Sequence, residues 1–267
     1  MNSARSAGII SQVRMGSTRL PGKVLLPVAG RCFLDFHVER LRQSGLPVAL
    51  ATTTLPADDV LAAYATAHGL PCFRGSEDDV LARYFGANQA FGFEPVVRVT
   101  SDCPLLDGPT IGAAVGRYRA EGNPRAYRAN VVRRTFPRGL DFEVFSAELL
   151  AQAHAEARRP AEREHVTPYL RDVLAPAGRA VLRHELCPLG DHSAARITLD
   201  TPEDLAVLRC LVEDFGAAAL ALPELLALLA AHPEVLALNA GIAQKTDRKS
   251  TRLNSSHPSI SRMPSSA

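Results

Sequence analysis

The segment VRMGSTRLPGKVLLP, residues 13–27, combines cations, hydroxyls and glycines directly after a short apolar run. Glycine lets the backbone approach an anion closely, and Arg14, Arg19 and Lys23 carry enough charge to surround a triphosphate. Lys23 is the only lysine before residue 245, in a chain with 27 arginines and 3 lysines. Because an ammonium on a flexible stem can follow a phosphate better than a planar guanidinium, we expect Lys23 to face phosphate oxygens. A polar surface loop is the alternative.

The spacing of this loop excludes two common phosphate-binding motifs. Gly16 and Gly22 are separated by five residues, whereas a Walker loop has four, and Val24 follows the lysine where that loop requires serine or threonine. The dinucleotide fingerprint GxGxxG is absent from the sequence as well. The loop therefore predicts an anion site of another class.

Two aspartates follow separate strand patterns and predict a cation site. Asp102 ends the run VVRVTSD before a proline turn, and Asp200 ends the run ARITLD before a helix pattern. In an open α/β sheet the carboxyl ends of the strands share one edge, so both carboxylates should reach the same cleft. Magnesium is usually held by one or two carboxylates, with substrate phosphates and water as its other ligands. For either aspartate alone, a helix cap or a turn is the commoner role.

Two further groups of polar residues are candidates for binding or deprotonating a second substrate. Glu164 and His165 stand together in EREHVTPY, although their spacing fits no metalloprotease motif. In TFPRGLDFEVF, Arg138, Asp141 and Glu143 could line an acceptor pocket, since the last two share one face of a predicted strand. A packed histidine and an exposed polar hairpin are the alternatives. Asp141, Glu143 and His165 are the candidate bases, with a metal-bound hydroxide as the other option.

The elements that must position these residues alternate between short apolar runs and longer helical patterns. Strands are expected at residues 7–13, 48–54, 71–75 and 96–102, and helices at 33–45, 57–69 and 77–92. This alternation predicts an α/β fold with a mostly parallel central sheet and helices on both faces. Shorter runs after residue 123, among them AYRAN, GLDFEVF and VLRHELC, predict a small mixed-sheet extension.

The C-terminal part of the chain predicts one more strand and a group of apolar helices. The strand is expected at residues 195–200, before a helix with Thr201 as its N-cap and Pro202 in its first position. The Ala/Leu-rich helices of residues 217–238 should be buried as core, with a dimer face as the alternative.

Composition predicts one enzyme-sized domain over residues 1–245, in a chain of 267 residues that is 46% hydrophobic. Residues 246–267 contain seven serines and no periodicity, so we expect a disordered tail that is not native. The formal net charge of +2 becomes −1 without this tail, because the rest holds 26 basic and 27 acidic residues. A net charge this close to zero does not favour a nucleic acid or a membrane surface as a partner.

The cysteines and the apolar segments predict a cytoplasmic protein. Five cysteines are widely spaced and form no CxxC pair, which favours reduced thiols over a disulfide framework or a zinc site. The first 13 residues have too short an apolar run for a signal peptide, and prolines interrupt the apolar stretch of residues 215–238. We therefore expect no membrane-spanning segment.

Taken together, these motifs resemble the cytidylyltransferases of the spore-coat polysaccharide type, which are related to CMP-Kdo and CMP-sialate synthetases. The matching stretches are IISQVRMGSTRLPGKVLLPVAG, RGSEDDVLARY, VVRVTSDCPLLD, RGLDFEVF, EREHVTPY and RITLDTPEDL, in the order of the family. The resemblance covers residues 7–245 and implies a Rossmann-like nucleotide-diphosphosugar transferase fold. It also implies that Arg14, Arg19 and Lys23 bind a triphosphate and that Asp102 and Asp200 hold Mg²⁺.

The function that this resemblance implies is Mg²⁺-dependent transfer of CMP from CTP to an acidic sugar for a surface polysaccharide, with release of pyrophosphate. The expected catalytic residues are Arg14, Lys23, Asp102 and Asp200. The expected nucleotide-binding residues are Gln12, Arg14, Met15, Gly16, Ser17, Arg19, Lys23, Arg74, Ser76, Asp79, Thr100 and Asp102. The acceptor sugar is assigned to Arg138, Asp141, Glu143, Glu164 and His165. The alternatives are a UTP-dependent or other sugar nucleotidyl or glycosyl transferase, and a non-catalytic nucleotide-sugar-binding module.

Overall fold

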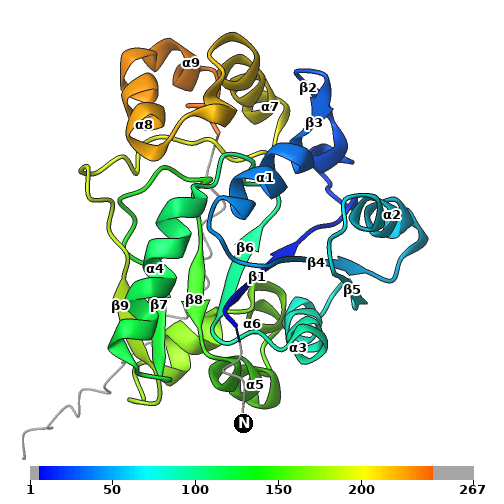
Figure 1. The fold of residues 1–267 in the computed structure, drawn as a ribbon, viewed down its shortest axis with the longest axis vertical. Helices are drawn as coiled ribbons and strands as arrows, with labels where there is room; N and C mark the ends of the chain where they lie inside the picture. Colours follow the sequence, from blue (N-terminus) through cyan, green and yellow to red (C-terminus); the bar gives the residue numbers. More distant parts are fainter. Residues whose placement is uncertain (1–5, 243–267) are drawn as a thin grey trace, which may run out of the picture.

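The computed structural model describes residues 6–242, which fold around a seven-stranded sheet with the order β5-β4-β1-β6-β8-β7-β9 (Figure 1). The strands are β1 (Gly8–Gln12), β4 (Val48–Thr53), β5 (Cys72–Gly75), β6 (Val96–Thr100), β7 (Ala126–Ala129), β8 (Glu143–Phe145) and β9 (Val181–His184). The first four in chain order pair in parallel, whereas β8 runs antiparallel to both β6 and β7. The predicted fold class, a mostly parallel sheet with a small mixed extension, is confirmed. A separate hairpin joins β2 (Pro27–Val28) to β3 (Arg31–Cys32).

Helices cover both faces of the sheet because successive strand residues point to opposite sides. The helices are α1 (Phe33–Arg42), α2 (Asp59–Ala67), α3 (Val80–Phe91), α4 (Gly108–Glu121), α5 (Ala147–Glu156), α6 (Pro160–His165), α7 (Pro202–Arg209), α8 (Leu222–Ala231) and α9 (Pro233–Ala237). Ile9 of β1 packs into the apolar cluster with α1, α2 and α4, whereas the next residue, Ile10, packs into the cluster with α3 and α5. The helices expected at 33–45, 57–69 and 77–92 are therefore present as α1, α2 and α3.

A third apolar cluster holds the C-terminal helices against α1, at the top of Figure 1. Leu225, Leu226 and Leu229 of α8 are buried there with Phe33 of α1. One face of the Ala/Leu-rich stretch is thus core, while the rest of it is exposed. Short 3-10 or π turns connect these and other elements at Lys23–Leu25, Pro56–Asp58, Leu170–Leu174, Cys210–Asp214 and Ala217–Ala219.

The prediction of a strand at residues 195–200 was wrong. The segment runs extended and forms one isolated bridge, between Arg138 and Arg196, because its neighbour is a loop rather than a strand. Even so, the Leu199 amide donates to the Asp102 carbonyl at 2.7 Å, which brings the following residue, Asp200, to the expected edge. The helix start after it is confirmed: Thr201 caps α7, and Pro202 is its first residue.

Several other sequence predictions concern single segments. Among residues 6–242, none of the helices combines the length and apolar character needed to cross a bilayer. All five cysteines lie within this range and are free thiols. The predicted tail of residues 246–267 lies outside the described residues.

Candidate active site

A cavity of about 900 Å³ opens where the carboxyl ends of β1 and β6 meet the loop that follows β1. Lys23 is held at its edge by the 3-10 turn Lys23–Leu25, and its ammonium lies between two carboxylates. The Lys23 Nζ atom donates to Asp200 Oδ1 at 2.6 Å and to Asp102 Oδ2 at 3.2 Å. Gly22, just before the turn, has φ +65°, a left-handed conformation that favours glycine. The chain direction at Lys23 therefore depends on that residue.

The charges of this triad support one another. Burial alone would lower the pKa of Lys23, but the two carboxylates outweigh it and raise that pKa above its ordinary value. Burial would likewise raise the pKa of Asp102, yet the Lys23 charge and hydrogen bonds from Thr100, at 2.6 Å, and from Lys23 lower it to about 2. The lysine and Asp102 are therefore both charged at neutral pH.

The surroundings of Asp200 are also cationic. Its Oδ2 atom lies 3.3 Å from an Arg19 nitrogen and 3.5 Å from an Arg196 nitrogen. Arg196 in turn forms a two-point contact with the fully buried Asp204 of α7, at 2.8 and 2.7 Å. Helix α7 thus fixes one of the cations that hold the Asp200 carboxylate in place.

A buried histidine fixes the backbone beside Asp102. His37 of α1 is fully buried, and its two ring nitrogens bond the Ser11 hydroxyl at 2.7 Å and the Cys103 carbonyl at 2.9 Å. Burial lowers the pKa of His37 to about 4, so the ring is neutral at neutral pH. These bonds connect β1, α1 and the turn that carries Asp102.

The loop after β1 is anchored by a carboxylate from a distant segment. Asp58, itself buried, accepts the Met15 amide at 2.7 Å and also accepts hydrogen bonds from the amide and hydroxyl of Thr53. The Met15 side chain packs against the apolar cluster under the loop. Met15 therefore uses its amide and its side chain for structure, and it does not line the cavity as the predicted nucleotide-binding set requires.

The cavity brings together most, but not all, of the predicted site residues. Those that line it are Gln12, Arg14, Gly16, Ser17, Arg19, Lys23, Thr100, Asp102, Glu164, His165 and Asp200. Those outside its lining are Met15, Arg74, Ser76, Asp79, Arg138, Asp141 and Glu143. The predicted loop cations and both aspartates therefore line one cavity, whereas several of the residues predicted to bind the acceptor sugar lie outside it.

Three predicted nucleotide ligands lie outside the cavity lining: Arg74 contacts the segment that follows β4, and Ser76 and Asp79 shape the loop after β5. Arg74 donates to the Thr53 carbonyl at 2.8 Å and pairs with Asp59. The Ser76 hydroxyl accepts the Asp79 amide at 3.1 Å, and the Asp79 carboxylate caps α3 by accepting the Ala82 amide at 2.9 Å. Ser76 and Asp79 therefore shape the start of α3.

Three residues predicted to bind the acceptor sugar do not line the cavity, and each makes other contacts in the fold. Glu143 of β8 stands opposite Arg98 of β6 in the sheet register, is almost fully buried, and bonds both Arg98 and the Tyr127 hydroxyl. Asp141 precedes the strand rather than sharing a strand face with Glu143, and it pairs with Arg134 at 2.9 Å. The backbone of Arg138 pairs with the extended segment that leads to Asp200.

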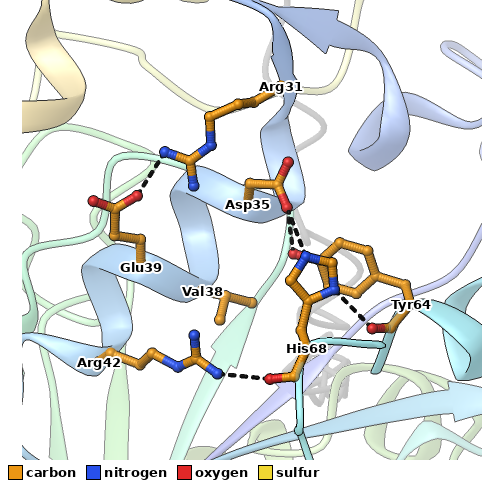
Figure 2. A pocket seen from close by; sticks show the side chains of 7 residues that line it. All are labelled: Arg31, Asp35, Val38, Glu39, Arg42, Tyr64 and His68. Atoms are coloured by element: carbon orange, nitrogen blue, oxygen red, sulfur yellow. Dashed lines mark hydrogen bonds and ion pairs between the residues drawn. The ribbon is translucent and has the colours of Figure 1, made fainter. Parts of the chain in front are cut away.

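A second cavity, of about 440 Å³, lies between α1 and α2 and is lined by none of the predicted residues (Figure 2). Its polar groups bond one another: the Tyr64 hydroxyl donates to Asp35 at 2.8 Å, and Arg31 pairs with Glu39 at 2.7 Å. His68 stacks on the Tyr64 ring. Because the larger cavity contains the predicted loop cations and both predicted aspartates and this one contains none of them, the larger cavity is the candidate active site.

Comparison with known proteins identifies the family to which this arrangement belongs. A family model described as cytidylyltransferase matches residues 7–220. The chain belongs to the cytidylyltransferase family. The resemblance predicted from the sequence motifs is confirmed.

Relatives of this cytidylyltransferase include a curated protein and two solved structures. The spore coat polysaccharide biosynthesis protein SpsF of Bacillus subtilis is 33% identical over 217 residues, which cover 78% of this chain and 86% of that protein. A cytidylyltransferase structure from Leptospira borgpetersenii has a TM-score of 0.82 and 32% identity, covering 90% of this chain and 100% of its own. A CMP:2-keto-3-deoxy-manno-octonic acid synthetase complexed with CTP has a TM-score of 0.58 and 17% identity, covering 79% and 99%, and so shares the fold.

The site of this cytidylyltransferase also contains residues that the sequence analysis missed. Arg83 of α3 lines the cavity although it is almost fully buried, and it donates to the Ser76 and Glu77 carbonyls. Arg163 of α6 lines the same wall and donates to the Asp79 carboxylate at 3.0 Å. Both residues lie inside stretches that carry the family resemblance, Arg163 in EREHVTPY and Arg83 in RGSEDDVLARY, although the helical periodicity alone does not distinguish Arg83 from any other helix residue.

Proposed function

We propose that this chain transfers CMP from CTP to a hydroxyl of an acidic sugar, forming a CMP-sugar and releasing pyrophosphate. The observation that carries the proposal is the position of Lys23 between Asp102 and Asp200 at the edge of a cavity lined by Arg14 and Arg19. Family membership supports a cytidine nucleotide. This arrangement of cations and carboxylates suits a triphosphate with a divalent cation better than it suits a neutral ligand.

The two carboxylates fit a magnesium ion by the chemistry of their donors. One ammonium contacts both, so their oxygens converge where a single cation can reach them. Hard carboxylate oxygens suit Mg²⁺, and residues 6–242 contain no group of three or more His, Cys, Asp or Glu arranged for a metal ion. The remaining ligands would therefore be triphosphate oxygens and water. Bound magnesium would supply neutralisation of the phosphate charge.

The side chains of the protein would act by positioning and by charge. Arg14, Arg19 and Lys23 would bind the β- and γ-phosphates and stabilise the charge that grows on departing pyrophosphate. His165 and Glu164 line the cavity from α6. Of the three candidate bases, only His165 is among the residues that line the cavity. We propose that it removes the proton from the acceptor hydroxyl. In-line attack on the α-phosphorus then needs no covalent intermediate with the protein.

A pyrophosphate-release assay tests this function. The full chain, CTP, MgCl₂ and a panel of acidic sugars should release pyrophosphate with at least one sugar, and Asp102→Asn should abolish the release. Parallel reactions with UTP test the alternative nucleotide. CTP binding without turnover on any sugar would favour the non-catalytic module, and the absence of both binding and turnover would exclude the proposal.

A further inference from the structure

Lys23 occupies the position that a cation shared by Asp102 and Asp200 would take. Its Nζ atom touches one oxygen of each carboxylate, at 3.2 and 2.6 Å, and its side chain is only 13% exposed. Arg19 approaches Asp200 at the other oxygen, Oδ2, and is 38% exposed. Lys23 therefore bridges both carboxylates and is largely buried, whereas Arg19 contacts only Asp200 and is more exposed.

An ammonium in this place and a divalent cation on the same two carboxylates exclude each other. The other oxygen of each carboxylate already faces Thr100 or Arg19, so both cations would compete for the same two oxygens. Two positive groups a few ångströms apart in a partly buried site also repel strongly. For the cation to bind, Lys23 has to leave. Its flexible four-carbon stem allows such a movement, and the phosphate oxygens of a triphosphate offer its charge a new partner.

We propose that Lys23 is a built-in competitor for the cation site, which a metal and triphosphate displace together. This inference rests on the proposed function and deepens it. A divalent cation alone displaces Lys23 without supplying another anion for the ammonium to pair with, so the cation binds weakly. A metal–CTP complex brings both the cation and the new partner, so it binds well. Binding of the metal and binding of the triphosphate are therefore coupled through one side chain.

The test measures MnCl₂ binding to the nucleotide-free chain by the electron paramagnetic resonance signal of free Mn²⁺. Lys23→Met should bind Mn²⁺ at least about tenfold more tightly than the wild type, because one competing charge is gone. The matched control, Arg19→Met, also removes a cation beside Asp200 but should change Mn²⁺ affinity much less. Lys23→Arg keeps the charge and should therefore not show this tenfold gain in Mn²⁺ affinity. The order reverses for the Mn²⁺–CTP complex, which Lys23→Met should bind more weakly than the wild type.

Thermal unfolding checks that the variants fold and gives a second readout. Without metal, Lys23→Met should melt at a lower temperature than the wild type, because its two carboxylates lose the ammonium that lies between them. Mn²⁺ should then raise its melting temperature more than that of the wild type. Adding Asp102→Asn to Lys23→Met should remove the gained affinity, and a gain that survives this change would place the metal elsewhere and overturn the inference.

The possible failures are distinguishable. Equal Mn²⁺ affinity in the wild type and Lys23→Met would overturn the competition, while pyrophosphate release by the wild type would leave the proposed function standing. If no variant bound Mn²⁺ with or without CTP, both the competition and the metal role in the proposed function would be overturned.

Discussion

At the scale of single residues, the choice of lysine at position 23 has a structural reason. The ammonium fits between two carboxylates that approach it from different segments, with contacts of 2.6 and 3.2 Å. A guanidinium is planar and larger, so it would engage one carboxylate in a two-point contact more readily than bridge both. The chain uses arginine almost everywhere else, and at this position a compact ammonium fits where a guanidinium would not bridge both carboxylates as readily.

Lys23→Arg should therefore impair turnover although it conserves charge. We expect kcat/KM for CTP to fall at least about tenfold, since a planar guanidinium does not reproduce the contacts of the ammonium, first with the two aspartates and then with the phosphate oxygens. Steady-state pyrophosphate release measures this effect. Arg42→Lys, an exposed exchange at the second cavity, is the matched control and should be neutral. Full activity in Lys23→Arg would contradict the argument.

The residues outside the cavity show what sequence cannot reveal at this scale. Glu143 is engaged because Arg98 stands opposite it in the sheet, and such a pairing depends on register between strands far apart in the chain. Met15 is engaged because its amide bonds Asp58, 43 residues away. By contrast, Asp102 follows the end of β6 almost directly, and Lys23 stood out as the lone lysine in the loop after β1, so both could be placed near one edge of the sheet in advance.

At the scale of elements, the turn after β6 depends on contacts from α1. His37 joins Ser11 of β1 to the Cys103 carbonyl, directly beside Asp102. The sequence predicts α1 from its periodicity, but it does not show that this histidine faces inward toward the site. The strand prediction at 195–200 failed for a related reason: pairing is a property of the neighbour as well as of the segment.

The stability of the protein should depend on pH through His37. The folded chain keeps this ring neutral down to a pKa of about 4, whereas the unfolded chain takes up a proton near the ordinary pKa of 6.5. Stability is therefore complete above about pH 6.5 and falls as the pH drops toward 4. Urea unfolding at pH 7 and pH 5 should differ by about 2 kcal/mol from this group.

His37→Gln should remove that contribution, because glutamine does not titrate. His68→Gln, on a ring that is 41% exposed, should retain the wild-type difference. Identical pH dependence in the wild type and His37→Gln would show that His37 is not the responsible group.

At the scale of the whole molecule, the C-terminal helices pack against the segments that position the site residues. Ile197 and Leu199, on the extended segment that ends in Asp200, are buried in the same apolar cluster as α8. That cluster also includes Phe33 of α1, so it touches the helix that carries His37. The hydrophobic pattern indicated burial of α8, but which part of the site it supports became clear only from the fold.

Leu225→Ala should destabilise the protein by about 2 to 5 kcal/mol, because it leaves a cavity in a fully buried cluster. Leu238→Ala, at a leucine that is 51% exposed, is the control and should change stability by less than about 0.5 kcal/mol. Chemical denaturation measures both. A similar loss in the two variants would mean that α8 contributes no more than a surface helix.

One hydrogen bond described above limits how the cleft can move. The Leu199 amide donates to the Asp102 carbonyl at 2.7 Å, so the backbones beside the two site carboxylates are tied directly to each other. Any hinge motion that separated Asp102 from Asp200 would have to break this bond and expose a buried leucine. Asp102 and Asp200 should therefore move as one unit, so any opening of the cavity has to come from segments that this bond does not join.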